Sequence, residues 1–410
     1  MKKITCSLFV ASLLFFSACE EQSTENKPVR LGAWDYEWMQ NVKNDLHAGG
    51  EKYVPAYNQL IIDADEALNG GVFSVTNKNL VPPSSNKHDY MSMGPYWWPD
   101  PKKEDGLPYI RRDGEINPER DKLDSSQKNK LITGVRSLSL AWFFTGNESY
   151  ANKAAELLRV WFLDEETLMH PHLEYAQGIP GITPGRFIGV IDATSFYVLV
   201  DAIALLETSG ALTASEQEGI KSWFKRYFRW LVESEHGVNE DNYKNNHSVA
   251  YDLQSSSIAY FLGDEDFTAR KVREMPRRRI DPMIEEDGRQ PEELIRTKAF
   301  GYSVGNLGNF FRVGEKGLKV GVNVFHYKNE KGGSLQKALD YLVQFIGKED
   351  EWPYEQIASW EHTENNLGLI VRKAACIYEN EAYQKLWEDV FLERMKTEWI
   401  LLVTPEYKKQ

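Results

Sequence analysis

Asn245-Asn246-His247-Ser248 opens a stretch of mainly apolar residues that runs to Leu262. Asn is among the preferred N-cap residues, so an Asn pair ahead of an apolar run predicts the start of a helix. Asn246 and His247 would then lie at the helix N-terminus, where free N–H groups and the helix dipole favour an anion. An amide and an imidazole in that place could hold a carboxylate and transfer a proton. A capping Asn followed by a solvent-exposed His is the alternative interpretation.

Helical periodicity continues on both sides of this stretch. It is found in segments 53–68, 131–144, 150–162, 186–206 and 213–235, and again from residues 265, 334, 361 and 380. Strand-like alternation is scarce and is limited to Val320–Tyr327. Helical hairpins of these lengths predict an all-α fold, an (α/α) toroid or incomplete α/α barrel with few short strands.

A long irregular segment interrupts the helices between residues 81 and 120. Its many prolines disfavour helices and central strands. It also contains Tyr96-Trp97-Trp98, and such a density of aromatic rings argues against disorder. Because long loops in compact domains are often functional, we predict an ordered flap whose Tyr96, Trp97 and Trp98 face a groove and bind substrate. Packing of these rings against the core is the alternative.

Length and charge bound the class of protein. The chain has 410 residues, of which 42% are hydrophobic, enough for one large domain that we place at residues 36–410. The net charge of −13 argues against a nucleic-acid partner. An acidic polysaccharide is compatible with that charge, because salt screens surface charges beyond about 8 Å and cations in a cleft act locally.

The first nineteen residues have the pattern of an export signal. Lys2-Lys3 precede an apolar stretch, Leu8–Phe16, that is too short to be a permanent membrane helix. Cys19 follows in a pattern that resembles a bacterial lipobox, and it would be lipidated after cleavage. We therefore expect residues 1–19 to be a lipoprotein signal peptide and residues 20–35 a polar tether. The domain would be exported and lipid-anchored, in the periplasm or on the outer membrane of a Gram-negative bacterium. An ordinary cleaved signal peptide is the alternative.

A second polar segment, residues 292–303, contains Arg296, Lys298 and Tyr302. The planar fork of an Arg matches a carboxylate. A Tyr can donate or accept a proton once neighbouring cations lower its pKa, which is normally about 10. Arg296 and Tyr302 would not share a face of one straight helix, so we expect Gly301 to provide a bend between them. A Tyr packed in the core is the alternative.

Asn, His, Arg and Tyr together suit the β-elimination of a uronic acid polymer. Binding the carboxylate stabilises an enolate-like intermediate, a base removes the C5 proton, and an acid protonates the leaving O4. Side chains can hold the carboxylate, so this reaction needs no metal. His170-Pro171-His172 suggests a metal pair, but no further ligands stand at metal-site spacing. We therefore predict no metal site and no cofactor.

Five motifs follow one another between about residues 80 and 380: Tyr96-Trp97-Trp98-Pro99-Asp100-Pro101, Gly106-Leu107-Pro108-Tyr109, Leu173-Glu174-Tyr175-Ala176-Gln177-Gly178-Ile179-Pro180-Gly181, Asn245-Asn246-His247-Ser248, and Arg296-Thr297 up to Tyr302. With these motifs the chain resembles the alginate lyase superfamily, and most closely polysaccharide lyase family 38. The resemblance implies an (α/α) toroid and an eliminase that acts on alginate or glucuronan.

Residue roles follow from the resemblance by position. Asn246 would bind the uronate carboxylate, and His247 would assist it or act as base. Arg296 would stabilise charge near Tyr302, and Tyr302 would protonate O4.

Two further residues belong to the predicted site. The resemblance makes the neighbourhood of Gln177 part of the cleft wall, and Lys298 is a second substrate-binding candidate. Lys298 and Arg289 are also alternatives to Arg296 in its role beside the tyrosine.

Stereochemistry separates the possible bases. In D-mannuronate and D-glucuronate, H5 and O4 lie on the same ring face, so Tyr302 could act as base and acid. In L-guluronate they lie on opposite faces, and His247 would be needed as base. Two other functions stay open: a lipoprotein that binds glycans without cleaving them, and a glycoside hydrolase that uses two carboxylates on the same toroid.

Overall fold

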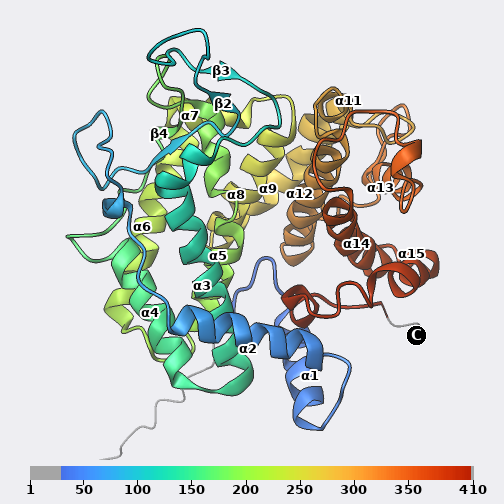
Figure 1. Ribbon diagram of the computed structural model, residues 1–410. Coiled ribbons are helices and arrows are strands. Elements are labelled where there is room, and N and C mark those ends of the chain that lie inside the picture. Colours follow the sequence, from blue (N-terminus) through green and yellow to red (C-terminus); the bar gives the residue numbers. More distant parts are fainter. Residues whose placement is uncertain (1–28, 408–410) are drawn as a thin grey trace, which may run out of the picture.

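The computed structural model describes residues 29–407 and confirms the all-α fold (Figure 1). Within these residues the only strands are four segments of two to four residues each. The expected signal peptide with Cys19, and the expected tether up to residue 28, lie outside the described residues.

One row of helices forms the inner layer, and each contacts the next along the row: α3 (Asp124–Thr145), α5 (Phe196–Leu206), α8 (Asn246–Leu262), α12 (Ala299–Lys319) and α14 (Trp360–Ile377). A second layer packs on this row: α2 (Val54–Leu68), α4 (Glu148–Phe162), α6 (Ala214–Glu233), α9 (Glu265–Met275), α13 (Leu335–Val343) and α15 (Glu381–Leu386). The two layers form the open, incomplete α/α barrel that the sequence predicts.

The remaining helical elements connect or cover these layers: α1 (Tyr36–His47), α7 (Glu235–Asp241), α10 (Asp281–Met283), α11 (Pro291–Leu294), η1 (Val75–Asn77), η2 (Pro118–Lys122), η3 (Phe187–Ala193), η4 (Pro276–Ile280), η5 (Glu349–Glu351), η6 (Trp387–Phe391) and η7 (Trp399–Leu402). Of these, η4 and η6 are π-helical turns, and the other η elements are 3₁₀ turns.

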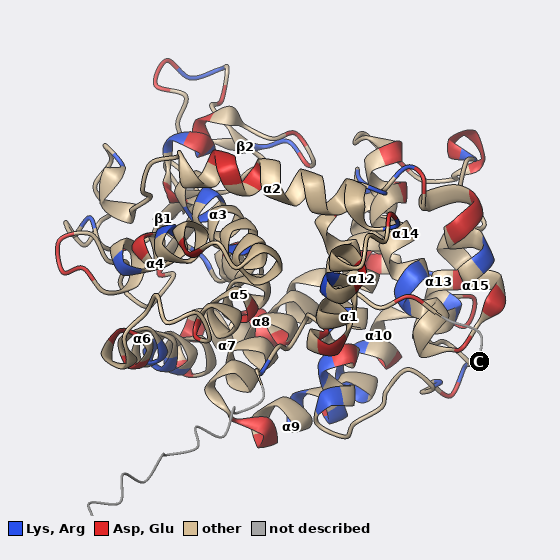
Figure 2. Ribbon diagram, turned by 90° about the horizontal axis from the view of Figure 1, so that it is seen from below, with Lys and Arg blue, Asp and Glu red and all other residues tan. Residues whose placement is uncertain are grey.

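Burial explains the division into layers. Helix α8 is buried almost all round, and the hydroxyls of Ser255, Ser256 and Ser257 donate to backbone carbonyls of the same helix. Charged residues gather instead on outer helices such as α6, α9 and α15 (Figure 2). The Asn-Asn-His motif lies at the N-terminal end of this buried helix.

The predicted helix at 186–206 is in fact two elements, because η3 ends at Ala193 and α5 begins at Phe196. The η3 backbone packs against β4, and a Cβ added to Gly189 would lie 2.4 Å from the Ala176 carbonyl oxygen. By length and composition Phe187–Leu206 could cross a membrane, but 67% of its apolar window is buried inside the domain. It is a core segment. The strand-like stretch at residues 320–327 forms turns, so that prediction was wrong.

The packed domain begins earlier than residue 36. Leu31 and Trp34 are buried. The N–H groups of Gly32, Ala33 and Trp34 donate to the buried carboxylate of Asp201 at 2.7, 2.7 and 2.9 Å. Residues 29–35 are therefore part of the domain and not of a tether.

The segment at 81–120 is an ordered flap at the top of Figure 1. It contains β1 (Met91–Met93), β2 (Trp97–Trp98) and β3 (Ile110–Arg111). Strand β2 pairs antiparallel with β3, whereas β1 pairs parallel with β4 (Tyr175–Gly178). The flap is thus tied to itself and to the chain that leads into η3.

Candidate active site

Two adjoining cavities form one groove between the flap and the inner helices. They have volumes of about 420 and 500 Å³ and share Ile191, Asn246 and Tyr302 in their linings. Tyr96, Trp97, Gln177, His247 and Arg296 line the first cavity, and Lys298 lines the second. A larger cavity of about 840 Å³ beside the flap is mainly apolar and contains none of the predicted site residues. The groove is therefore the candidate active site.

The Asn-Asn motif begins helix α8 as predicted. The side chain of Asn245 caps the helix by accepting from the N–H of His247 at 3.2 Å. Asn246 donates from its backbone N–H and its side-chain amide to the two oxygens of Glu293, at 2.7 and 2.5 Å. Glu293 lies on α11 and is buried. This buried acceptor fixes the orientation of the Asn246 amide at the groove.

His247 is paired with a buried acid. Its Nδ1 lies 2.8 Å from Oε1 of Glu240, whose side chain is fully buried on α7. A carboxylate that accepts from Nδ1–H fixes the tautomer and leaves the lone pair on Nε2. The imidazole is thereby arranged to accept a proton at Nε2.

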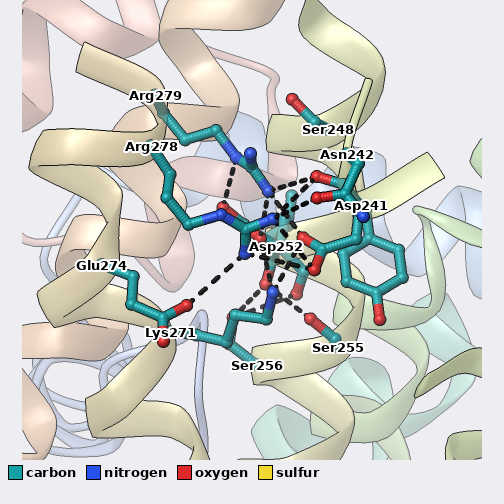
Figure 3. A network of polar contacts seen from close by, with 12 residues as sticks. Asp241, Asn242, Ser248, Asp252, Ser255, Ser256, Lys271, Glu274, Arg278 and Arg279 are labelled. Atoms are coloured by element: carbon teal, nitrogen blue, oxygen red, sulfur yellow. Dashed lines mark hydrogen bonds and ion pairs between the residues drawn. The ribbon is translucent and has the colours of Figure 1, made fainter. Parts of the chain in front are cut away.

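A buried ionic network holds the end of α7 that carries Glu240 (Figure 3). The neighbouring Asp241 binds Lys271, Arg278 and Arg279, and Arg279 also binds Asp252 at 2.8 Å. Burial alone would raise the pKa of Asp241, but these three cations lower it. Arg279 is buried although it belongs to the basic run Arg277-Arg278-Arg279, a pattern that in sequence is typical of a solvated helix end.

Arg296 and Tyr302 meet at the groove. Arg296 donates from Nη2 to the Tyr302 hydroxyl at 3.0 Å, and Tyr302 donates to the Tyr96 hydroxyl at 2.7 Å. Asp113 of the flap accepts from Nε and Nη2 of Arg296 at 3.1 and 2.9 Å. The contact needs no bend at Gly301, which is inside α12. Arg296 reaches Tyr302 because it precedes the helix.

The ionisation of this cluster differs from the prediction. The pKa of Tyr302 is raised well above 10, mainly by burial and secondly by the neighbouring Tyr96, although Arg296 acts in the opposite direction. Burial also acts to raise the pKa of Asp113, but Arg296 and Arg111 hold it well below its usual range. Tyr302 is therefore a neutral phenol beside an Arg–Asp ion pair, and the expectation of a lowered tyrosine pKa was wrong.

Trp97 and Trp98 point to different surroundings. They are successive residues of β2, and successive strand side chains point to opposite faces. Trp97 lines the groove, with the Arg186 guanidinium 6.0 Å from its ring centroid. Trp98 lines neither cavity of the groove and stacks with Arg112 at 5.2 Å. Only Trp97 is placed to contact a sugar in the groove.

Gln177 forms part of the groove wall and holds a cation there. Its side-chain oxygen and backbone oxygen accept from Arg186 at 3.0 Å each, and its amide donates to Asp192 at 2.9 Å. Its φ of 49° lies in the left-handed region, which is costly for a residue other than Gly and is typical of functional sites.

Of the two alternatives to Arg296, only Lys298 is at the groove. Its ammonium lies 5.4 Å from the Tyr96 ring centroid, and burial lowers its pKa. The Arg289 side chain is 43% exposed, pairs with Asp287 and Glu285, and lines neither cavity.

Among the described residues that line the groove, cations outnumber anions. The cations are Arg111, Arg186, Arg296, Lys298 and Arg312, and the single carboxylate is Glu292. A chain with a net charge of −13 thus has a basic groove.

Sequence reasoning missed the charged residues that hold the predicted ones in place: Asp113, Arg186, Glu240 and Glu293. Arg296 and its partner Asp113 are 183 residues apart, so no local spacing signals the pair. Glu240 is only seven residues before His247 in the sequence, so its pairing with that histidine could have been predicted.

An open α/α barrel with Asn, His, Arg and Tyr around a basic groove defines an all-α polysaccharide lyase. The chain belongs to the alginate lyase family, whose model matches residues 74–352. It is 39% identical to an alginate lyase from Bacteroides ovatus of known crystal structure, with a TM-score of 0.89 over 93% of this chain and 100% of that one.

More distant structures share the fold. Two complexes of alginate lyase A1-III with a tetrasaccharide are each 14% identical, with TM-scores of 0.51. One match covers 79% of this chain and 88% of that one, and the other covers 86% and 89%. No curated protein sequence matches the chain significantly.

Proposed function

We propose that this lyase cleaves a 1,4-linked polyuronate, alginate or glucuronan, by β-elimination in which Tyr302 protonates the leaving O4. The single observation that carries the proposal is the hydrogen bond from Arg296 to the Tyr302 hydroxyl, in a groove that Asn246 and His247 also line. The neutral phenol beside a fixed cation is suited to give up a proton to an oxygen whose bond is breaking.

Asn246 is suited to bind the uronate carboxylate. Its side-chain amide has two N–H donors, and Glu293 occupies one of them. The second N–H can donate to the substrate carboxylate while the first keeps the amide in place. Together with the cations of the groove, this hydrogen bond stabilises the negative charge that develops when H5 leaves.

The base depends on the sugar. For L-guluronate, whose H5 lies opposite O4, we propose His247 as base, with Glu240 stabilising the imidazolium that forms. For D-mannuronate and D-glucuronate, H5 and O4 share a face, and we propose that the Tyr302 oxygen takes H5 as its proton passes to O4. In both cases H5 leaves C5, the C4–O4 bond breaks, and a C4=C5 double bond forms.

The basic groove favours an acidic polymer as substrate. The five cations can form ion pairs with a polyuronate, which carries one carboxylate per sugar, whereas an uncharged glycan offers only hydroxyls to hydrogen-bond. The alginate lyase from Bacteroides ovatus supports alginate as the first polymer to test.

A glycoside hydrolase on this fold is disfavoured by the same lining. Hydrolysis of a glycosidic bond uses two carboxylates that flank it. Glu292 is the only carboxylate in the described lining of the groove, and it pairs with Lys244 at 3.0 Å.

A polymer panel tests the function. The purified protein is mixed with polymannuronate, polyguluronate and glucuronan, and the ultraviolet absorbance of the C4=C5 double bond is followed. We expect absorbance to rise with at least one polymer. Saturated products would identify a hydrolase, and binding without any product would identify a glycan-binding protein; either result overturns the proposal.

We also propose that the protein is an exported lipoprotein attached through Cys19, as the lipobox-like sequence suggests. Expression in a Gram-negative host with labelled fatty acid should label the wild type and not the Cys19→Ser variant. A wild type that takes up no label would contradict the anchor.

A further inference from the structure

Outside the groove, two histidines and one aspartate converge at a single point. The donor atoms of Asp89, His170 and His172 all lie within 4.8 Å of one another. Oδ1 of Asp89 is 2.6 Å from Nδ1 of His170 and 3.1 Å from Nε2 of His172. Sequence spacing alone showed only the two histidines, because Asp89 is 81 residues away from His170.

Neighbouring groups hold the three side chains in place. The ring of His88 stacks on His170 with centroids 5.3 Å apart, and Nδ1 of His88 is fixed by the Leu168 carbonyl oxygen at 2.6 Å. The rings of His172 and Tyr175 form a T-shaped pair with centroids 6.4 Å apart. The cluster is therefore organised before any ligand arrives.

The cluster is closed on one side and open on the other. The Asp89 side chain is 7% exposed, whereas those of His170 and His172 are 37% and 23% exposed. An ion could enter from solvent and keep water as an additional ligand, as zinc does at sites with three protein ligands.

We propose that Asp89, His170 and His172 bind one divalent transition-metal ion, zinc being the best fit to two imidazoles and a carboxylate. Ligand atoms around a tetrahedral zinc ion at about 2.0 Å are separated by about 3.3 Å. The two pairs that involve Asp89, at 2.6 and 3.1 Å, require a small opening, and the two imidazole nitrogens already lie within 4.8 Å of each other. To bind the ion, each imidazole offers the lone pair of the nitrogen that now faces Asp89 and carries its proton on the other ring nitrogen.

The position of the cluster indicates a structural role. Asp89 lies just before β1, which begins at Met91, and His172 lies just before β4, which begins at Tyr175. These strands pair in parallel, with Met91 opposite Tyr175, and the N–H of Gln177 donates to the Ser92 hydroxyl at 2.8 Å. A metal ion would join the two chain segments where the flap leaves the helical body. It would thus brace the wall that Gln177 forms, without entering the groove.

Zinc binding to the full-length protein tests this site. Chelator-treated protein is titrated with Zn²⁺ alone by calorimetry, and its melting temperature is measured with and without Zn²⁺. We expect one equivalent of Zn²⁺ per chain and a higher melting temperature, because a ligand that binds the folded state stabilises it. His170→Gln and His172→Gln should each lose that equivalent.

His326→Gln is the matched control, because His326 is exposed and outside the cluster. It should keep the equivalent and the rise in melting temperature. If wild-type protein takes up no Zn²⁺ and its melting temperature does not change, the proposal is overturned even if the cluster variants fail to fold. Retention of the full equivalent by both folded cluster variants would overturn it as well.

Discussion

Arg296 donates a hydrogen bond to the Tyr302 hydroxyl at 3.0 Å and lies over the tyrosine ring, with its guanidinium carbon 4.1 Å from the ring centroid. The same guanidinium is held from the other side by Asp113 of the flap. The flap therefore positions the cation that positions the phenol. A proton donor in this lyase depends on two segments that are far apart in the chain.

Removing the Tyr302 hydroxyl should abolish most activity. In Tyr302→Phe we expect kcat to fall about 10²- to 10⁴-fold, the range of general acid–base catalysis, on every polymer that the wild type cleaves.

His247→Asn should reduce cleavage of polyguluronate more than that of polymannuronate, because only guluronate needs a base opposite the phenol. Initial rates on the two polymers measure both effects. Equal losses for His247→Asn on both polymers would contradict the assignment of the base.

The geometry of the Arg296 fork should matter as much as its charge. Arg296→Lys keeps the charge, but a lysine ammonium lacks the planar fork that hydrogen-bonds to Asp113 and to Tyr302 at the same time. Loss of a charged hydrogen bond costs about 1.5–3 kcal/mol, so we expect kcat/KM to fall about 10- to 100-fold. Arg289→Lys is the matched control, since Arg289 is partly exposed and lines neither cavity of the groove. An equal loss in the two variants would mean that Arg296 has no special role.

The two adjacent tryptophans of β2 should differ in substrate binding. Trp97 lines the groove and Trp98 packs on Arg112 away from it. An aromatic contact contributes about 0.5–1.5 kcal/mol, so Trp97→Ala should raise KM about two- to tenfold. Trp98→Ala should leave KM within twofold of the wild type. Steady-state kinetics on one polymer compare the two, and a larger KM for Trp98→Ala would reverse the assignment.

The sequence predicted those parts of the fold and site whose signals are local. Helix periodicity and the Asn245 cap located α8, and with it Asn246 and His247. The pairing of Arg296 with Asp113 and the burial of Glu293 depend on tertiary packing, and no local pattern reports them. For the same reason, the raised pKa of Tyr302 could not be foreseen, because burial outweighs the nearby charge.

The buried network of Figure 3 should contribute strongly to stability. Arg279 is 2% exposed and binds Asp241 and Asp252, so Arg279→Met leaves the buried carboxylate of Asp252 and the half-buried one of Asp241 short of a partner. Breaking a buried ion pair costs about 3–5 kcal/mol. Arg277→Met, at an exposed position two residues away, should change the free energy of unfolding by less than about 0.5 kcal/mol. Urea denaturation measures both, and similar small changes would show that the network is dispensable.

The alkaline side of the pH–rate profile should report the Tyr302 phenol. An ordinary tyrosine loses its proton near pH 10, but burial and then Tyr96 raise the pKa of Tyr302 above that value. Because its pKa is raised, the Tyr302 phenol should stay protonated up to pH 10 and remain able to act as the acid. We therefore expect no decline in kcat/KM from loss of the phenol proton below pH 10.

Tyr96→Phe provides the matched comparison. It removes the hydroxyl that accepts from Tyr302 at 2.7 Å, and with it one cause of the raised pKa. The alkaline decline in kcat/KM should therefore move to lower pH in this variant. If the wild-type kcat/KM instead rises as the phenol loses its proton, the phenolate is the active form. Tyr302 would then begin the reaction as a deprotonated base and not as an acid.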